Sequence, residues 1–276
     1  KNVRVDVPIV GDVGTIIQQM AKAWKALKKR RTNGKAVRAW WKQIEEWRAV
    51  NCLAYSQDDK TIKPQYAIER LYELTKKRDT FITTEVGQHQ MWAAQFYKFE
   101  KPNRWMTSGG LGTMGYGFPA ALGVQMAYPE RLVIDIAGEA SIMMNIQELS
   151  TAIQHRLPVK IFILNNQYMG MVRQWQELLH GGRYSESYTD ALPNFVKLAE
   201  SFGAVGLRTD KPSELDDVIK EMIATDNVVI ADIGVDQMEN CLPMIPSGSA
   251  HNEMILGSET QSFGKDGVSD AGKVLV

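Results

Sequence analysis

Short apolar runs alternate with stretches of helical spacing through most of the chain. Residues 132–137 and 159–164 are two such runs with almost no charge, which is typical of strands buried on both faces of a parallel sheet. Residues 146–155 lie between them and repeat their apolar positions with the period of a helix. The pattern therefore predicts a β-α-β unit, and with it an α/β fold: a doubly wound, mainly parallel sheet with helices on both faces.

The same patterns predict further elements. Strands are expected at residues 3–9, 81–85 and 228–233, and helices at residues 16–27, 64–77, 118–127, 194–202 and 212–224. The basic run at residues 28–31 suits the C-terminal end of a helix better than a nucleic-acid contact. Another helix follows residue 34 and carries three tryptophans at helical spacing, Trp40, Trp41 and Trp47. Such an aromatic stripe belongs more often to a core or a subunit interface than to a binding platform.

Composition narrows the range of functions. The chain has 276 residues, of which 44% are hydrophobic and 23% charged, and its formal net charge is zero. This balance argues against a nucleic acid or an anionic membrane as a partner. Cys52 and Cys241 form no CxxC motif, the four histidines lack zinc-ligand spacing, and no apolar stretch reaches membrane-spanning length. A reducing, cytoplasmic setting is the default expectation.

Polar residues follow both strands of the predicted β-α-β unit. Because parallel strands end at the same edge of a sheet, Glu139 and Asn166 are expected to lie close together there. Their oxygens suit Mg²⁺ or Ca²⁺. Backbone N–H groups of Gly138, Ala140 and Ser141 lie at a helix start, where an anion such as phosphate binds. The sequence thus predicts a site for a metal-bridged diphosphate.

A second glycine-rich stretch invites a different interpretation. Residues 110–115 spell G-x-G-x-x-G, the fingerprint of dinucleotide-binding folds. The fingerprint must follow a strand, and residues 100–108 are polar and contain a proline, so we expect no dinucleotide site. The chain also lacks the Gly-x-Ser-x-Gly motif of hydrolases and the Gly-Lys-Ser/Thr of a P-loop.

The motifs resemble those of one enzyme family. Gly138-Glu139-Ala140, 24 further residues and Asn165-Asn166 resemble the cofactor motif of thiamine diphosphate enzymes. The stretches at residues 87–92, 109–117 and 170–175 resemble the catalytic subunit of acetohydroxyacid synthase (acetolactate synthase), and the likeness covers about residues 62–255. It departs from the family pattern at Glu139, where the family has Asp.

This resemblance implies a role for each site residue. Glu139, Asn166 and the Tyr168 carbonyl would bind Mg²⁺, while Gln88 and His89 would donate hydrogen bonds to the diphosphate. Met114 would support the cofactor in a bent conformation, and Trp175 would shape the pocket for the second substrate; these two are the expected catalytic residues. The cofactor-binding set is Gln88, His89, Gly112, Met114, Gly138, Glu139, Ala140, Ser141, Asn166, Tyr168, Gly170 and Met171.

The resemblance also implies an activity. It predicts decarboxylating condensation of pyruvate with a second 2-keto acid, pyruvate or 2-ketobutyrate, in branched-chain amino acid biosynthesis. A homo-oligomer and a small regulatory subunit are the implied partners, and FAD belongs to the full-length enzyme rather than to this chain. The alternatives are another thiamine diphosphate-dependent decarboxylase or carboligase, and a cofactor-binding module that is inactive without an N-terminal domain.

Domain boundaries follow from the same resemblance. Residues 1–33 are expected to be the end of a middle domain, and residues 34–60 a connecting helix and linker. Residues 61–257 would form the thiamine diphosphate-binding domain, with the stretch from residue 241 to residue 251 folding over the site. The polar tail at residues 258–276 is expected to be mobile.

Overall fold

The computed structural model describes residues 4–27, 33–246 and 248–256. The chain divides into two compact units, with the boundary between Asn51 and Cys52. The predicted domain boundaries stay predictions. Among the described residues, no helix has both the length and the apolar character needed to cross a membrane.

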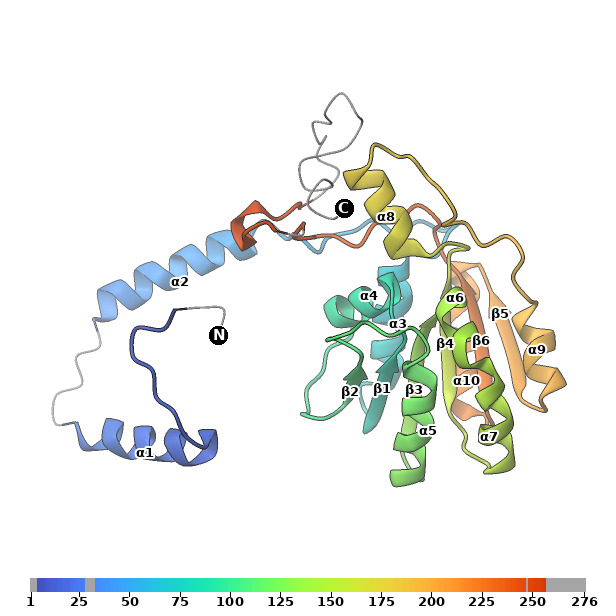
Figure 1. Cartoon of the computed structure of the whole chain (residues 1–276), viewed down its shortest axis with the longest axis horizontal. Coiled ribbons are helices and arrows are strands. Elements are labelled where there is room, and N and C mark those ends of the chain that lie inside the picture. The colour runs from blue at the N-terminus through green and yellow to red at the C-terminus, as the bar shows by residue number, and fades with distance from the viewer. Residues whose placement is uncertain (1–3, 28–32, 247, 257–276) are drawn as a thin grey trace. The chain divides into compact units, whose positions relative to one another are not determined.

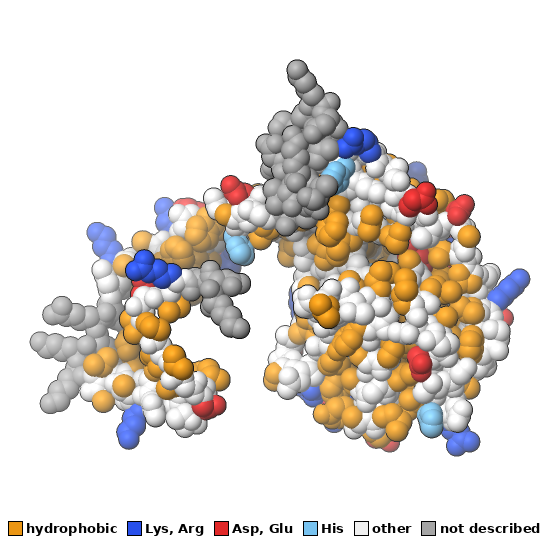
Figure 2. Space-filling view, in the orientation of Figure 1, with side chains coloured by type: hydrophobic (Ala, Val, Ile, Leu, Met, Phe, Trp, Pro, Cys, Tyr) orange, Lys and Arg blue, Asp and Glu red, His pale blue; other side chains and the backbone are white. Residues whose placement is uncertain are grey.

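The first unit holds two helices, α1 (Val13–Ala26) and α2 (Gly34–Arg48), and neither buries a described residue. Side chains cap both N-termini: Asp12 accepts from the Thr15 N–H at 2.9 Å and Asn33 from the Ala36 N–H at 3.1 Å. Apolar side chains of these helices are exposed, among them Trp24, Trp40, Trp41 and Trp47. Figure 2 shows hydrophobic side chains on the surface of this unit.

The strand expected at residues 3–9 is wrong, because residues 4–10 form neither a strand nor a helix. Alternating valines give a strand its two faces, but a strand also needs a neighbour for its backbone hydrogen bonds, and no other described segment pairs with this one. The basic run at residues 28–31 lies outside the described residues.

The second unit is built on one six-stranded sheet in which every neighbouring pair is parallel. Figure 1 shows helices on both sides of this sheet. The strands, in the spatial order β2-β1-β3-β4-β6-β5, are β1 (Thr80–Thr84), β2 (Trp105–Thr107), β3 (Leu132–Gly138), β4 (Lys160–Asn165), β5 (Val205–Thr209) and β6 (Val229–Gly234). The helices are α3 (Pro64–Thr75), α4 (Gln88–Phe96), α5 (Gly117–Ala127), α6 (Glu139–Ile142), α7 (Leu149–Gln154), α8 (Gly170–Leu179), α9 (Phe195–Ser201) and α10 (Pro212–Ala224), with short 3₁₀ turns at Met143–Glu148 and His251–Glu253.

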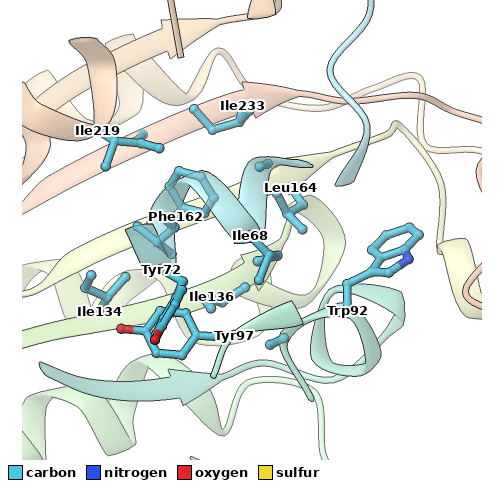
Figure 3. Packing of buried hydrophobic residues seen from close by; sticks show 14 of the residues in the cluster. Ile68, Tyr72, Trp92, Tyr97, Ile134, Ile136, Phe162, Leu164, Ile219 and Ile233 are labelled. Carbon is cyan, nitrogen blue, oxygen red and sulfur yellow. The ribbon is translucent and has the colours of Figure 1, made fainter. Parts of the chain in front are cut away.

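The core consists of two apolar layers, one on each face of the sheet. Helices α3, α4 and α10 cover the face shown in Figure 3, and α5, α7 and α9 cover the other. Successive residues of β3 serve the two layers in turn: Val133 faces the α5 side, and Ile134 faces the α3 side. Burial on both faces explains why the strands read as continuous apolar runs, and it confirms the predicted doubly wound fold.

Two short strands escaped the sequence analysis. β2 lies within residues 100–108, directly before the G-x-G-x-x-G stretch. The argument that no strand precedes this stretch, used above against a dinucleotide site, is therefore wrong. β5 is only half-buried and lacks a long apolar run. The helix expected at residues 146–155 is also shorter, because residues 146–148 belong to a 3₁₀ turn and α7 spans only Leu149–Gln154. The backbone kinks just before this stretch at Asn145, whose Nδ2 donates to the Gly115 carbonyl at 2.6 Å.

The order of the strands creates a crevice. β2 lies on one side of β1 and β3 on the other, so the chain reverses its direction of winding at β1. α4, which follows β1, packs on one face, whereas Ile142 of α6, which follows β3, packs on the opposite face. The loops after β1 and β3 therefore part at the carboxyl edge, the place where α/β sheets bind ligands.

Two glycines give opposite predictions for stability. A Cβ on Gly206 in β5 would lie 2.5 Å from the Val196 Cα of α9, so Gly206→Ala should lower the free energy of unfolding by about 1–3 kcal/mol. Gly123 in α5 has no described atom within 4 Å of such a Cβ, so Gly123→Ala should raise that free energy by about 0.5–1 kcal/mol. Urea denaturation measures both, and equal stability of Gly206→Ala and the wild type would contradict the packing described.

Candidate functional site

The crevice between the carboxyl ends of β1 and β3 opens into a pocket of about 160 Å³. Apolar side chains form much of its wall, including Val86, Trp92, Leu164 and Met169. All the residues that the resemblance assigns to the cofactor line it: Gln88, His89, Gly112, Met114, Gly138, Glu139, Ala140, Ser141, Asn166, Tyr168, Gly170 and Met171. The pocket thus brings together residues from four separate parts of the sequence.

Two glycines allow the pocket walls to approach each other. A Cβ on Gly138 would lie 2.7 Å from His89 Nδ1, and a Cβ on Gly170 would lie 2.0 Å from Gln88 Oε1. No side chain fits in either place without displacing the imidazole or the amide. Glycine is required here for close approach rather than for an unusual backbone angle.

His89 is a buried imidazole with an unused hydrogen-bonding atom. Its Nε2 has no partner in the described part of the chain. Burial lowers the pKa of His89 to about 3, although a hydrogen bond with the Glu85 backbone acts in the opposite direction. The ring is therefore neutral near pH 7, and a ligand in the pocket can provide the missing partner for Nε2.

Glu139 begins α6 with its side chain almost entirely buried, at 1% exposure. Burial raises the pKa of Glu139 to about 7, and hydrogen bonds from nearby backbone N–H groups and Thr189 oppose this only in part. The Thr189 Oγ1 bond is long, at 3.4 Å, and no ion pair joins Glu139 to another described residue. A buried carboxylate without a cationic partner suits a metal ion.

Asn166 and Gln88 meet at the back of the pocket. Asn166 Nδ2 donates to Gln88 Oε1 at 3.2 Å, and Asn166 Oδ1 accepts from the Tyr168 N–H at 3.2 Å. Gln88 Nε2 donates to Gln174 Oε1 at 2.7 Å and to the Glu239 carbonyl at 3.2 Å. Both hydrogens of the Gln88 amide are thus donated to other protein groups. The predicted hydrogen bond from Gln88 to a diphosphate would require the amide to give up one of these two bonds.

The predicted metal ligands are one carboxylate, one amide and one backbone carbonyl. The described residues contain no group of three or more His, Cys, Asp or Glu side chains that could hold a metal by themselves. Glu139 and Asn166 fit a hard cation that takes its remaining oxygens from phosphate and water. The chemistry of the donors therefore agrees with Mg²⁺ shared between protein and diphosphate.

The sequence analysis missed two buried carboxyl groups beneath the pocket. Glu85 Oε2 accepts from the Gly115 N–H at 2.5 Å and from Ser141 Oγ at 3.1 Å, so it joins the loop that carries Met114 to the start of α6. Asp135 accepts from Thr83 Oγ1 at 2.8 Å. Burial raises the pKa of both groups, and the charge of Glu85 raises that of Asp135 further. The sequence offered one signal for these two groups: Asp135 lies inside an apolar strand, and Glu85 directly follows one.

Trp175 does not line the pocket. It lies on α8 with 40% of its surface exposed, although Met171 and Val172 of the same helix do reach the wall. Its role toward a second substrate stays a prediction. The segment after β6 returns to α8, where Cys241 meets Gln174; the tail at residues 258–276 lies outside the described residues.

Comparison with known proteins agrees with this site. Residues 85–233 match the family described as "Thiamine pyrophosphate enzyme, C-terminal TPP binding domain", and the chain belongs to that family of cofactor-dependent enzymes. Within it, the chain is similar to the acetolactate synthase isozyme 3 large subunit of Escherichia coli (strain K12), with 48% identity over 93% of this chain and 45% of that protein.

Two other relatives point the same way. The acetolactate synthase large subunit of Haemophilus influenzae is 46% identical over 93% of this chain and 44% of its own length. The mitochondrial acetolactate synthase catalytic subunit of Saccharomyces cerevisiae is 43% identical over 92% of this chain and 36% of its own length. The chain spans less than half the length of these curated relatives.

The pKa of His89 predicts acid sensitivity of the unliganded chain. The pKa in the folded state lies below the ordinary value of 6.5, so the unfolded chain takes up the proton first as the pH falls. The free energy of unfolding should fall by about 2 kcal/mol between pH 6.5 and pH 5 through this group alone.

Substitution of His89 by Phe should remove that loss, as measured by urea denaturation at several pH values. His155→Phe, at an exposed position, is the matched control and should keep the wild-type pH dependence. An identical loss in all three proteins would show that His89 is not the group responsible.

Proposed function

We propose that this chain is the cofactor-binding part of a thiamine diphosphate-dependent acetolactate synthase. The observation that carries the proposal is the pocket itself, which unites the cofactor residues assigned from the sequence in a chain related to acetolactate synthase large subunits. The substrates would be pyruvate and a second 2-keto acid. Pyruvate as acceptor gives 2-acetolactate, and 2-ketobutyrate gives 2-aceto-2-hydroxybutyrate.

The residues of the pocket would bind and orient the cofactor. When bound, thiamine diphosphate supplies the electron sink for decarboxylation and for addition to the second keto acid. His89 Nε2 and the backbone N–H groups at the start of α6 would hold the diphosphate, while Glu139, Asn166 and the Tyr168 carbonyl would hold Mg²⁺.

The apolar wall would serve the reaction in a second way. Met114 lines the pocket from the loop that Glu85 holds at Gly115, and its bulky side chain would support a bent cofactor. Leu164 and Trp92 complete a surface that excludes water. A dry site strengthens every electrostatic interaction within it and protects a reactive carbon from protonation.

The complete enzyme would be a homo-oligomer in the cytoplasm, with a small regulatory subunit and FAD as further components. The chain alone is expected to make no acetolactate, because in the resembling family the glutamate that activates the cofactor reaches the site from another domain. Another thiamine diphosphate decarboxylase or carboligase is the alternative. Product analysis of the complete enzyme with pyruvate separates these two activities. Acetolactate supports the proposal, and acetaldehyde supports a decarboxylase.

The metal site can be tested at Glu139. Calorimetric titration with thiamine diphosphate at fixed Mg²⁺ should show binding to the wild-type chain, and Glu139→Gln should weaken it by about tenfold or more if the carboxylate is a direct ligand. Glu139→Asp should bind the cofactor more tightly, because the shorter side chain matches the family pattern. Glu130→Gln, at an exposed turn, is the control. Equal affinities of all four proteins would exclude Glu139 as a ligand.

The proposed role of Trp175 concerns the acceptor. Trp175→Leu, introduced into the complete enzyme, should alter the ratio of products from pyruvate and 2-ketobutyrate more than it alters total turnover. The acceptors differ by one methylene, worth about 1–3 kcal/mol in an apolar pocket, so loss of discrimination is limited to that range. Competition between the two acceptors measures the ratio, and an unchanged ratio would assign Trp175 to packing.

A further inference from the structure

A continuous path of amides leads from the segment after β6 to the proposed metal site. It starts at the Cys241 backbone and runs through Gln174 on α8 and Gln88 on α4 to Asn166 after β4. We propose that Gln174 is a positioning residue that fixes the orientation of Gln88, and through Gln88 presents the amide oxygen of Asn166 to the metal ion. This inference rests on the proposed function, because it concerns the same cofactor site.

Gln174 is held by a backbone group whose polarity cannot change. Its Oε1 accepts from the Cys241 N–H at 2.8 Å, and its Nε2 donates to the Cys241 carbonyl at 2.9 Å. The side chain is 1% exposed, so water cannot replace these bonds. Rotation of the amide by half a turn would place donor against donor and acceptor against acceptor. The Cys241 backbone therefore selects one orientation of Gln174.

That orientation passes to Gln88. Gln174 Oε1 also accepts from Gln88 Nε2 at 2.7 Å, which requires the nitrogen of Gln88 to face Gln174. The Glu239 carbonyl accepts from the same nitrogen at 3.2 Å and favours the same arrangement. The oxygen of Gln88 is consequently directed toward Gly170 and Asn166.

The last step orients the metal ligand. Because Gln88 presents its oxygen, Asn166 must present Nδ2 to it, at 3.2 Å. Asn166 Oδ1 is then left on the other side of the amide, where it accepts from the Tyr168 N–H. A cation needs the oxygen and is repelled by the NH₂ group. A polarity set 75 positions along the chain from Asn166 therefore acts together with the Tyr168 N–H to hold the Asn166 amide in the orientation that a metal needs.

Other contacts hold the segment after β6 without Gln174. Arg173 Nη2 donates to the Glu239 carbonyl at 2.9 Å and to Asn240 Oδ1 at 2.7 Å. Lys63 Nζ pairs with Asp236 at 2.9 Å and with Glu239 at 2.5 Å. Substitution of Gln174 should accordingly leave the segment docked, so that its effect on the metal site can be measured separately from unfolding.

The test is calorimetric titration of the chain with thiamine diphosphate at several Mg²⁺ concentrations. Gln174→Met keeps the length of the side chain and removes the amide, and it should weaken binding at low Mg²⁺ by about tenfold or more. Excess Mg²⁺ should restore binding, because the defect lies in the orientation of a metal ligand; loss of packing would not respond to the metal.

Gln176→Met is the matched control on the same helix. Gln176 Nε2 donates to the Ser185 carbonyl at 2.8 Å and its Oε1 accepts from Ser187 Oγ at 2.7 Å, so this variant loses side-chain hydrogen bonds outside the path. Its affinity for the cofactor should stay within about twofold of the wild-type value.

A double-mutant cycle shows whether Gln174 acts through Gln88. Gln88→Met should weaken binding as Gln174→Met does, and the double variant should bind no more weakly than Gln88→Met alone. If Gln174→Met does not fold, Gln174→Glu takes its place. It keeps the oxygen that accepts from Gln88, and its buried carboxyl, when protonated, keeps a donor for the Cys241 carbonyl. Its affinity should therefore be closer to that of the wild type than to that of Gln88→Met.

The outcomes separate this inference from the proposed function. Wild-type affinity of Gln174→Met at low Mg²⁺, independent losses in the double variant, or a Gln174→Glu variant as weak as Gln88→Met would each overturn the inference alone. A wild-type chain that binds no thiamine diphosphate at any Mg²⁺ concentration would overturn the proposed function, and the inference with it.

Discussion

Burial of the parallel strands on both faces is the constraint on which the rest of this structure depends. Both layers of the core must be covered, so helices leave neighbouring strands β1 and β3 for opposite faces, and the loops between them separate. The resulting crevice is lined by backbone N–H groups and polar side chains, some of which have no hydrogen-bond partner among the described residues. The ligand site is therefore a by-product of the way in which the sheet is covered.

The carboxyl and amide groups around this crevice are held at a cost that the surrounding structure must offset. Glu139 keeps a raised pKa, and Nε2 of His89 has no partner among the described residues. Glu85, by contrast, is satisfied by the Gly115 and Phe118 N–H groups and by Ser141. Beneath the pocket, Asp135 Oδ2 also has no partner among the described residues. His89 Nε2 and the Glu139 carboxyl face the pocket and are left for a ligand to complete, as expected of a preorganised binding site.

The fold could be predicted from the sequence, because it depends on short-range patterns. The strand ends placed Glu139 and Asn166 at one edge of the sheet, and the family resemblance supplied the other site residues, whose roles stay predictions. The long apolar strands and the turns at residues 87 and 138 carry strong local signals. β2 and β5 carry weak ones, being short or half-buried. Gln174 could not be found in this way, since its importance arises from Gln88 and Cys241, 86 and 67 positions distant. Glu85 and Asp135 could be noticed in the sequence as acidic residues in or next to apolar strands. Only the structure shows that Glu85 accepts from Gly115 and Ser141, and Asp135 from Thr83.

The path from Cys241 to Asn166 also has a consequence for biosynthesis. A ribosome releases the chain from its N-terminus, so the walls built from residues 85–141 emerge well before the segment at residues 236–244. Until that segment returns to α8, Gln174 and Gln88 lack their bonds to the Cys241 and Glu239 backbone, and the Tyr168 N–H alone orients the Asn166 amide. The nascent pocket can thus have its walls while the Gln88 amide is still without a fixed orientation, and the path to Asn166 is completed only when some of the last described residues have been translated.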